Sequence, residues 1–150
     1  MTIRFGPEAP GERSEVEALL RSNDWEADRL DVGEVWVARD DAEVIGAVHG
    51  SPLPPDAGFY VEAALVEEAR RGRGIGADLM QAVHDAHPGD VYLACHDNRV
   101  AFYERLGYAR VEEARLPAAV RVFAHVVKDL PSRPDHVHHM MRREPGGSGS

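Results

Sequence analysis

Residues 70–76 read Arg-Arg-Gly-Arg-Gly-Ile-Gly, and this stretch carries more information about the fold than any other part of the chain. The mostly apolar run at 59–66, interrupted by Glu62, predicts a strand buried on both faces. Residues 74–86 predict a helix with one apolar stripe, at Ile75, Leu79, Ala82, Val83 and Ala86. The glycine-rich stretch therefore joins a buried strand to the start of a helix.

The glycines of this stretch let the backbone turn tightly and let a ligand approach the main-chain amides. The first free N–H groups of the following helix point the same way, with the positive end of the helix dipole behind them. Together they predict a cradle for a diphosphate. The order Gly-x-Gly-x-Gly excludes a dinucleotide loop, which needs Gly-x-Gly-x-x-Gly, and no Lys-Ser/Thr follows as a P-loop requires.

A second informative segment, at 98–108, reads Asn-Arg-Val-Ala-Phe-Tyr-Glu-Arg-Leu-Gly-Tyr. It predicts a short helix over 98–106, with Gly107 just past its end. The two segments together resemble the GCN5-related N-acetyltransferases, the GNAT superfamily. Its pyrophosphate loop, Arg/Gln-x-x-Gly-x-Gly/Ala, is matched by Arg71, Gly74 and Gly76, and its helix ending in Tyr-Glu-x-x-Gly-Phe/Tyr is matched at 103–108. The resemblance spans about residues 2–143.

The remaining pattern follows the order of elements in this family. Alternating or apolar runs predict further strands at 2–5, 34–39, 43–49, 91–95, 108–113 and 136–143. A capping-box spacing at Ser14 and Glu17 predicts a helix that buries Val16, Leu19 and Leu20 and ends near Asn23. Residues 24–30 predict a shorter helix, and the proline-rich stretch 50–58 predicts a stiff loop. Residues 117–130 fit either a helix or a strand, and Pro117 favours the helix.

The resemblance implies a fold of the α/β (α+β) class, with a mixed central sheet of about six to seven strands flanked by helices. The length of 150 residues suits one domain, which we place at 1–145, followed by a flexible Gly/Ser tail at 146–150. Cys95 is the single cysteine, which excludes an internal disulfide and a zinc site built on cysteines.

The charge balance narrows the class of partner. With 26 acidic and 17 basic residues the formal net charge is −9, which argues against nucleic acid and anionic membranes as partners. One short stretch of this acidic chain is positively charged, through Arg70, Arg71 and Arg73. No apolar stretch reaches the roughly 18 residues of a membrane span, and residues 1–17 lack the layout of a signal peptide. We therefore expect a soluble cytoplasmic protein.

The resemblance also implies an activity: transfer of an acetyl or other acyl group from acetyl-CoA, without a metal, by direct attack of a primary amine in a ternary complex. The acceptor would be an amine of a small molecule or peptide, and a homodimer is compatible with the family. Coenzyme A would be held by Leu65, Val66, Arg71, Gly72, Arg73, Gly74, Ile75, Gly76 and Asn98. The main chain at Leu65 and Val66 would stabilise the oxyanion. Asn98 lies five residues before Tyr103, whereas the family often has seven, which places it on a different helical face.

Two side chains are candidate catalytic groups. Tyr103 would be the general acid, because a phenol is protonated at neutral pH and can donate to a departing thiolate; the alternative is an aromatic core residue beside Phe102. Glu62, the one acid in the predicted central strand, would be the general base. The alternative is a residue that faces solvent or a structural partner. His96 and Asp97 are rival bases.

Other clusters have simpler explanations. Cys95 fits a small buried hydrophobe better than a nucleophile. His125, His136, His138 and His139 show no metal-ligand spacing, because positions 138 and 139 point to opposite sides of a strand. The acidic residues around Trp25 fit a solvated surface or an amine-attracting rim: Asp24, Glu26, Asp28, Asp31 and Glu34. The alternative function is a non-catalytic sensor of CoA or acyl-CoA.

Overall fold

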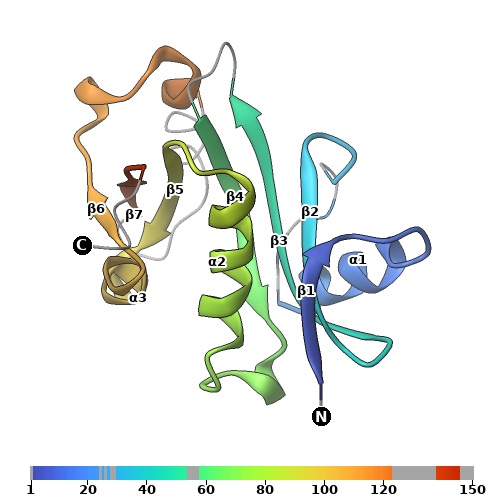
Figure 1. Ribbon diagram of the computed structural model, residues 1–150. Helices are drawn as coiled ribbons and strands as arrows, with labels where there is room; N and C mark the ends of the chain where they lie inside the picture. Colours follow the sequence, from blue (N-terminus) through green and yellow to red (C-terminus); the bar gives the residue numbers. More distant parts are fainter. Residues whose placement is uncertain are drawn as a thin grey trace. The chain divides into compact units, whose positions relative to one another are not determined.

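The computed structural model describes residues 2–23, 25, 27, 30–53, 58–122 and 138–145. Its strands are β1 (Ile3–Pro7), β2 (Glu34–Asp40), β3 (Glu43–Leu53), β4 (Gly58–Val66), β5 (Val91–His96), β6 (Tyr108–Arg110) and β7 (His138–Arg143). They form one sheet in the order β1-β2-β3-β4-β5-β7-β6 (Figure 1). β4 and β5 are parallel, whereas β1–β2, β2–β3, β5–β7 and β6–β7 are antiparallel.

The helices are α1 (Arg13–Arg21), α2 (Ile75–Ala86) and α3 (Val100–Arg105), and residues 118–122 are also helical. Short 3-10 turns lie at η1 (Glu68–Arg70), η2 (Asp97–Arg99) and η3 (Glu113–Arg115). The expectation of a mixed sheet of about seven strands with flanking helices is confirmed. No helix within the described ranges is both long enough and apolar enough to cross a membrane.

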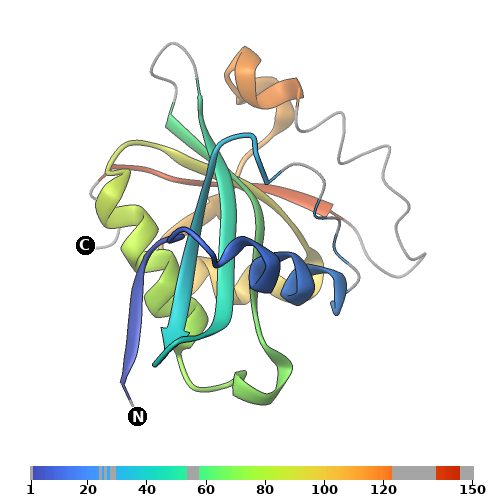
Figure 2. The ribbon, with the colours of Figure 1, turned by 90° about the vertical axis from the view of Figure 1, so that its right-hand side faces the viewer.

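The described residues form two compact units, one within 1–51 and 62–86 and the other within 52–61 and 87–150. In the first unit, α1 and α2 lie on opposite sides of the strands (Figure 2). Neighbouring residues of a strand point to opposite faces. Accordingly, Val37 and Ala47 belong to the core that α1 completes, whereas Gly46 faces α2, where a Cβ added to it would lie 3.5 Å from Leu79 Cδ2.

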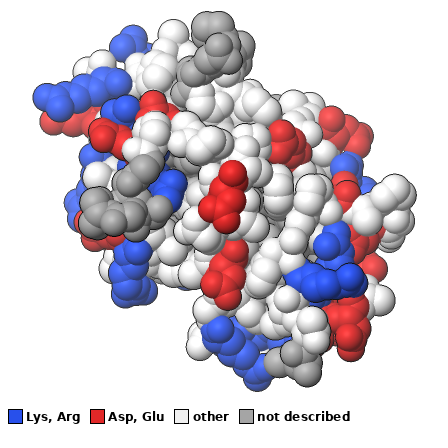
Figure 3. Space-filling view, viewed as in Figure 1, with Lys and Arg blue, Asp and Glu red and all other residues white. Residues whose placement is uncertain are grey.

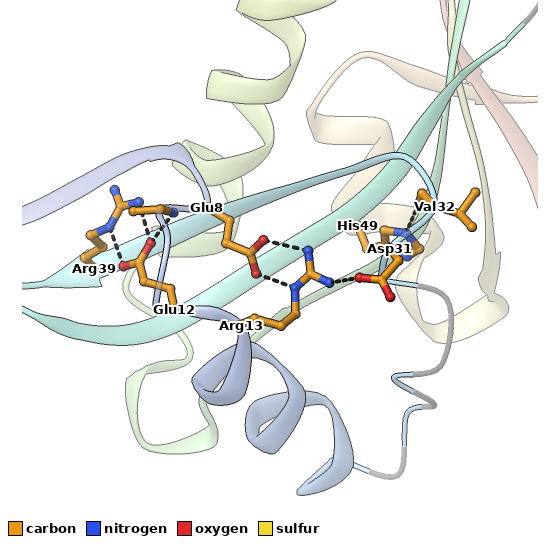
Figure 4. Close-up of polar contacts among 8 residues, drawn as sticks. Glu8, Glu12, Arg13, Asp31, Val32, Arg39 and His49 are labelled. Atoms are coloured by element: carbon orange, nitrogen blue, oxygen red, sulfur yellow. Dashed lines mark hydrogen bonds and ion pairs between the residues drawn. The ribbon is translucent and has the colours of Figure 1, made fainter.

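The core under α1 explains why this helix forms. The predicted stripe of Val16, Leu19 and Leu20 is buried against strand residues including Val35 and Val37. The helix begins at Arg13 rather than at the predicted Ser14 cap, and the residue before it, Glu12, makes no side-chain cap bond. Instead, the Glu12 carboxylate accepts hydrogen bonds from the Ala9 amide and the Arg39 guanidinium, and the latter lowers its pKa (Figure 4). A long-range ion pair thus replaces the local capping box.

The second unit has its own core, made of Leu53, Tyr60, Tyr92, Leu116 and Val120. β4 and β5 pair in it through Phe59, Tyr60 and Val61, and β5 then pairs with β7 along its whole length. Gly58 begins β4 with φ of 112°, and a Cβ there would lie 2.1 Å from the Asp90 carbonyl oxygen. Only glycine fits where the chain crosses so closely.

Four local expectations are wrong. Residues 50–53 continue β3 instead of forming a loop, and β6 ends at Arg110, after which 113–115 is a 3-10 turn. Ala86, predicted to be buried, is exposed at the end of α2. Met80 and His84 are buried as well as the predicted residues, so the buried face of the helix is wider than the predicted stripe. Asn98 lies in the 3-10 turn before α3 rather than in the helix.

Several expectations fall outside the described residues, in whole or in part. They are most of the predicted helix at 24–30, residues 54–57 of the loop, 123–130 of the ambiguous segment and the tail at 146–150. Residues 118–122 of the ambiguous segment are helical, which agrees with the role assigned to Pro117.

Candidate functional site

The chain between β4 and α2 is an exposed turn with an accessible backbone. Gly72 and Gly74 have φ of 81° and 79°, a region that residues with a side chain seldom adopt. A Cβ at either position would have no atom within 4 Å, so the space beside both glycines is open. The amide of Asp78 donates to the Gly74 carbonyl and closes the first turn of α2. The amides at 75–77 precede that bond and are the free donors of the helix start.

The first arginine of the loop is not available to a ligand. The Arg70 guanidinium donates to Asp40 Oδ2 at 2.6 Å and to Glu43 Oε2 at 3.4 Å, and Glu67 lies 3.8 Å away. The hydrogen bond to Asp40 raises the pKa of Arg70. Its charge is therefore compensated inside the first unit.

The second arginine is also engaged. Arg71 Nε donates to the Val66 carbonyl at 2.9 Å, and its Nη2 donates to Asn23 Oδ1 at 2.5 Å. Arg73, by contrast, is exposed and makes no hydrogen bond or ion pair with a residue that the structure describes. Figure 3 shows basic side chains gathered where the chain enters α2, with acidic ones along that helix. Of the three arginines, Arg70 is paired with acids, Arg71 is bonded to two neutral oxygens, and Arg73 has no partner among the described residues.

The end of β4 leads directly into this loop. Leu65 and Val66 are half-buried. The Val66 carbonyl accepts the bond from Arg71, and the following amide, of Glu67, donates to the Ile45 carbonyl at 2.7 Å. Both polar atoms of this peptide group are bonded, so the end of β4 has a fixed orientation.

Glu62 lies in the middle of β4, beside a histidine of β3 that the sequence reasoning missed. Its side chain is 15% exposed, and its Oε2 lies 3.8 Å from Nε2 of His49, which is itself 6% exposed. The same Nε2 lies 2.7 Å from the Val32 carbonyl oxygen (Figure 4). A carbonyl only accepts, so Nε2 carries a proton. The alternation of residues along a strand does not say how β3 and β4 are aligned. The sequence therefore could not predict that the His49 and Glu62 side chains lie close together.

Tyr103 and Asn98 belong to the second compact unit, whereas the glycine loop and Glu62 belong to the first. Tyr103 is 7% exposed and packs edge-on against Phe102 and Tyr108, with ring centroids 5.0 and 5.6 Å apart. Burial raises the pKa of its phenol, although a hydrogen bond and the charge of Arg99 act in the opposite direction. The hydroxyl therefore stays protonated at neutral pH.

Arg99 and Asn98 precede this tyrosine by four and five residues and have different environments. The Arg99 guanidinium lies 4.5 Å from the centre of the Phe102 ring, a cation–π contact. Asn98 is exposed, and its main-chain N–H donates a hydrogen bond to the carboxylate of Asp97 at 3.1 Å.

Cys95 is buried, with its Sγ 3.4 Å from Met141 Sδ. Burial raises the pKa of the thiol to about 11, so almost no thiolate exists at neutral pH. A buried, protonated thiol is a poor nucleophile, because only the thiolate attacks.

Two sequence candidates fall mainly outside the described residues. His125 and His136 lie there, and among the described residues no group of three His, Cys, Asp or Glu side chains could hold a metal ion. Of the acidic residues near Trp25, Asp24, Glu26 and Asp28 lie outside as well. Asp31 is described and accepts a hydrogen bond from Arg13 at 2.6 Å, which compensates its charge (Figure 4).

Comparison with known proteins identifies the fold. Residues 31–110 match the family model described as "Acetyltransferase (GNAT) domain". A search of curated protein sequences finds no match. Among solved structures, Arabidopsis thaliana Naa50 in complex with a bisubstrate analogue is 13% identical, with a TM-score of 0.73, and the match covers 96% of this chain and 99% of Naa50.

Two bacterial structures are similar as well. A GNAT acetyltransferase from Elizabethkingia anophelis with acetyl-CoA bound is 16% identical, with a TM-score of 0.66, over 95% of this chain and 97% of that one. N-acetylglutamate synthase from Neisseria gonorrhoeae, complexed with coenzyme A and N-acetyl-glutamate, is 14% identical with a TM-score of 0.75. The match covers 97% of this chain but only 35% of the synthase, so this chain corresponds to about a third of that enzyme.

Proposed function

The chain belongs to the acetyltransferase (GNAT) domain family, and on that premise we propose that it transfers an acetyl group from acetyl-CoA to a primary amine of a small molecule or peptide. The observation that carries the proposal is the open glycine loop. Gly72 and Gly74 have positive φ and empty space beside their Cα atoms, directly before the free amides of α2. A diphosphate needs an accessible backbone of this kind.

The residues of the loop fit coenzyme A as co-substrate. The main chain of 71–76 would hold the diphosphate, and Arg73 supplies a cation that no described residue neutralises. Asn98, which is exposed, would contact the pantetheine arm. Bound acetyl-CoA supplies the activated acetyl group.

The chain's own groups then divide the work on the reacting atoms. Main-chain N–H groups of Leu65 and Val66 would stabilise the negative charge on the carbonyl oxygen. The fixed Val66–Glu67 peptide keeps this end of β4 rigid. The buried phenol of Tyr103 would donate its proton to the departing thiolate, since its raised pKa keeps that proton in place at neutral pH.

Glu62 is our candidate for the general base, because an amine must lose its proton before it can attack. The carboxylate is nearly buried, and the protonated Nε2 of His49 lies 3.8 Å from it. The rivals His96 and Asp97 lie at the end of β5 and in η2. Glu62→Gln should lower kcat/KM for the amine at neutral pH, whereas Asp97→Asn should not. The opposite ranking would move the role to Asp97.

One experiment separates catalysis from the alternative, a sensor that binds CoA without turnover. Release of free thiol from acetyl-CoA is measured over a panel of amines, amino acids and peptides, beside a thermal-shift titration with coenzyme A. We expect both stabilisation and thiol release with at least one acceptor. Stabilisation without turnover on any acceptor would support the sensor, and the absence of both would contradict the assignment to CoA.

A further inference from the structure

We propose that Asn23 is a positioning residue for the diphosphate loop: it holds the Arg71 guanidinium on the end of β4, so that Arg71 orders the loop instead of contacting the phosphates. The inference rests on the proposed function and deepens it, because it concerns how the same loop is prepared for coenzyme A. All the residues involved lie in the first compact unit.

The contact between Asn23 and Arg71 joins segments 48 positions apart in sequence. Asn23 Oδ1 accepts from Arg71 Nη2 at 2.5 Å. The other end of the same amide, Nδ2, donates to the Leu19 carbonyl in the last turn of α1 at 2.9 Å. Because both ends of the amide are engaged, the oxygen is oriented toward Arg71 and α1 serves as its support.

Arg71 passes this restraint to the strand. Its Nε donates to the Val66 carbonyl at 2.9 Å, and the next amide along the chain is bonded to Ile45. Removal of the Arg71 bond would leave the Val66–Glu67 peptide held at one end only. A Cβ at either of the positive-φ glycines that follow would meet no atom within 4 Å. Arg71 therefore adds a second restraint on the start of the loop, beside the ion pairs of Arg70 with Asp40 and Glu43.

The geometry also explains why the Nε/Nη2 edge of Arg71 is a poor direct ligand for a phosphate. Its Nε and Nη2 form one edge of the guanidinium fork, the kind of edge that binds an oxyanion with two parallel hydrogen bonds. Here that edge is occupied by the Val66 and Asn23 oxygens. A phosphate on this edge would have to displace both partners.

The test measures the dissociation constant for coenzyme A by calorimetry on the full chain, and the unfolding free energy in urea without ligand. The variants are Asn23→Ala, Arg71→Ala, the double variant, Arg71→Lys and Asn23→Asp. Ser22→Ala is the matched control. The Ser22 hydroxyl donates to the same Leu19 carbonyl at 2.9 Å and accepts from Asn23 Nδ2 at 3.2 Å. This variant therefore weakens the end of α1 but leaves the bonds of Asn23 to Leu19 and to Arg71 in place.

We expect Asn23→Ala and Arg71→Ala each to raise the dissociation constant about fivefold, with the double variant no worse than either alone. Arg71→Lys should behave like Arg71→Ala, because an ammonium cannot span both oxygens. Asn23→Asp should weaken binding less than Asn23→Ala, since it keeps the acceptor oxygen for Arg71 but loses the Nδ2 bond to the Leu19 carbonyl. Ser22→Ala should lower the unfolding free energy slightly and leave the dissociation constant unchanged.

A different pattern would overturn the inference. If Arg71→Ala weakens binding about a hundredfold, Arg71→Lys rescues it and Asn23→Ala has no effect, then Arg71 contacts the phosphates directly. If Ser22→Ala matches Asn23→Ala, Asn23 only supports α1. Failure of the wild-type chain to bind coenzyme A would contradict the proposed function and with it the positioning role, while the coupling in unfolding free energy would still report on the Asn23–Arg71 contact.

Discussion

Tyr103 packs in a buried aromatic cluster and is also our proposed general acid. Its ring packs against Phe102 and Tyr108, and burial keeps its hydroxyl protonated. Tyr103→Phe removes the oxygen and keeps the ring, so it should lower kcat for acetyl transfer by about a hundredfold or more while the dissociation constant for coenzyme A barely changes. Steady-state kinetics and calorimetry check the two values.

The matched control is Tyr108→Phe. Tyr108 is 3% exposed, lies in the same aromatic cluster and also has a raised pKa, so this variant likewise removes one buried hydroxyl. Turnover should be preserved in it. Equal kinetics for the two variants would show that the hydroxyl of Tyr103 has no role as an acid.

At the residue scale, the sequence indicates candidate side chains but not the partners that each one contacts. The arginines at 70, 71 and 73 look alike in sequence. Their partners, Asp40 and Asn23, lie 30 and 48 positions away, and nothing local indicates them. The same holds for His49, which reaches Glu62 only through the pairing of strands. A residue's type is local information, whereas its partner depends on the tertiary fold.

Gly74 gives a prediction at the scale of the loop. Gly74→Glu adds a negative charge and a long side chain at φ of 79°, in the open space where a diphosphate would lie. Repulsion between like charges a few ångströms apart should weaken coenzyme A binding about a hundredfold or more, and backbone strain should cost about 1–2 kcal/mol of unfolding free energy. Calorimetry and urea unfolding measure the two effects.

Gly89→Glu is the control for charge. Gly89 also has open space around it but no positive φ, so this variant changes the net charge equally without strain. It should leave coenzyme A binding unaltered. Tight binding to the Gly74 variant would mean that the diphosphate lies elsewhere.

Arg73 gives the second prediction for the loop. It is the one arginine of the stretch without a partner among the described residues, so its charge is free to attract phosphates. Arg73→Ala should raise the dissociation constant for coenzyme A about two- to fivefold at low salt, and the difference should vanish near 0.5 M salt because screening removes exposed attractions. Arg70→Ala is the comparison, and its effect should appear mainly in unfolding free energy. A salt-independent loss in Arg73→Ala would indicate that its role is structural.

At the scale of elements, helices and strands with strong hydrophobic periodicity were predicted correctly, whereas several of their first and last residues were not. The apolar stripe at Val16, Leu19 and Leu20 correctly predicted α1, and the glycine-rich stretch correctly predicted where α2 begins. The extension of β3 through 50–53 was missed, because Gly50 and Pro52 suggest a loop. Pairing with β2 explains only Gly50, which lies opposite Glu34 at the end of that ladder, and residues 51–53 continue β3 beyond it.

At the scale of the whole molecule, the order of elements followed from two motifs, but the order of strands did not. β7 lies between β5 and β6, so the last strand in sequence is inserted beside the fifth. Its pairs, such as Leu93 with Met141, join residues 48 positions apart and are set by which faces must be buried. The net charge of −9 is likewise a sum over the whole chain, whereas among the described residues of the loop the acids compensate Arg70 but not Arg71 or Arg73.

The buried thiol and phenol groups of the second unit predict how the unfolding free energy depends on pH. Burial raises the pKa of the Cys95 thiol from about 9 to about 11, and it also raises those of Tyr92, Tyr103 and Tyr108. In the unfolded chain these groups ionise near their ordinary values. Above pH 9 the unfolded state therefore binds fewer protons than the native state, and the unfolding free energy must fall as pH rises.

We expect this stability to be fully present below about pH 8.5 and to decline steadily from pH 9 to 11, as measured by urea unfolding at constant ionic strength. Cys95→Ala should make the decline shallower between pH 9 and 10, where the thiol is the first of these groups to ionise in the unfolded chain. Arg71→Ala should lower the whole curve without changing its slope, because the bonds that it removes, to the Val66 carbonyl and the Asn23 amide oxygen, involve no titratable partner. A flat curve over this range would mean that these groups are solvated in the native state, and Tyr103 would then lack the buried environment on which its proposed role as an acid depends.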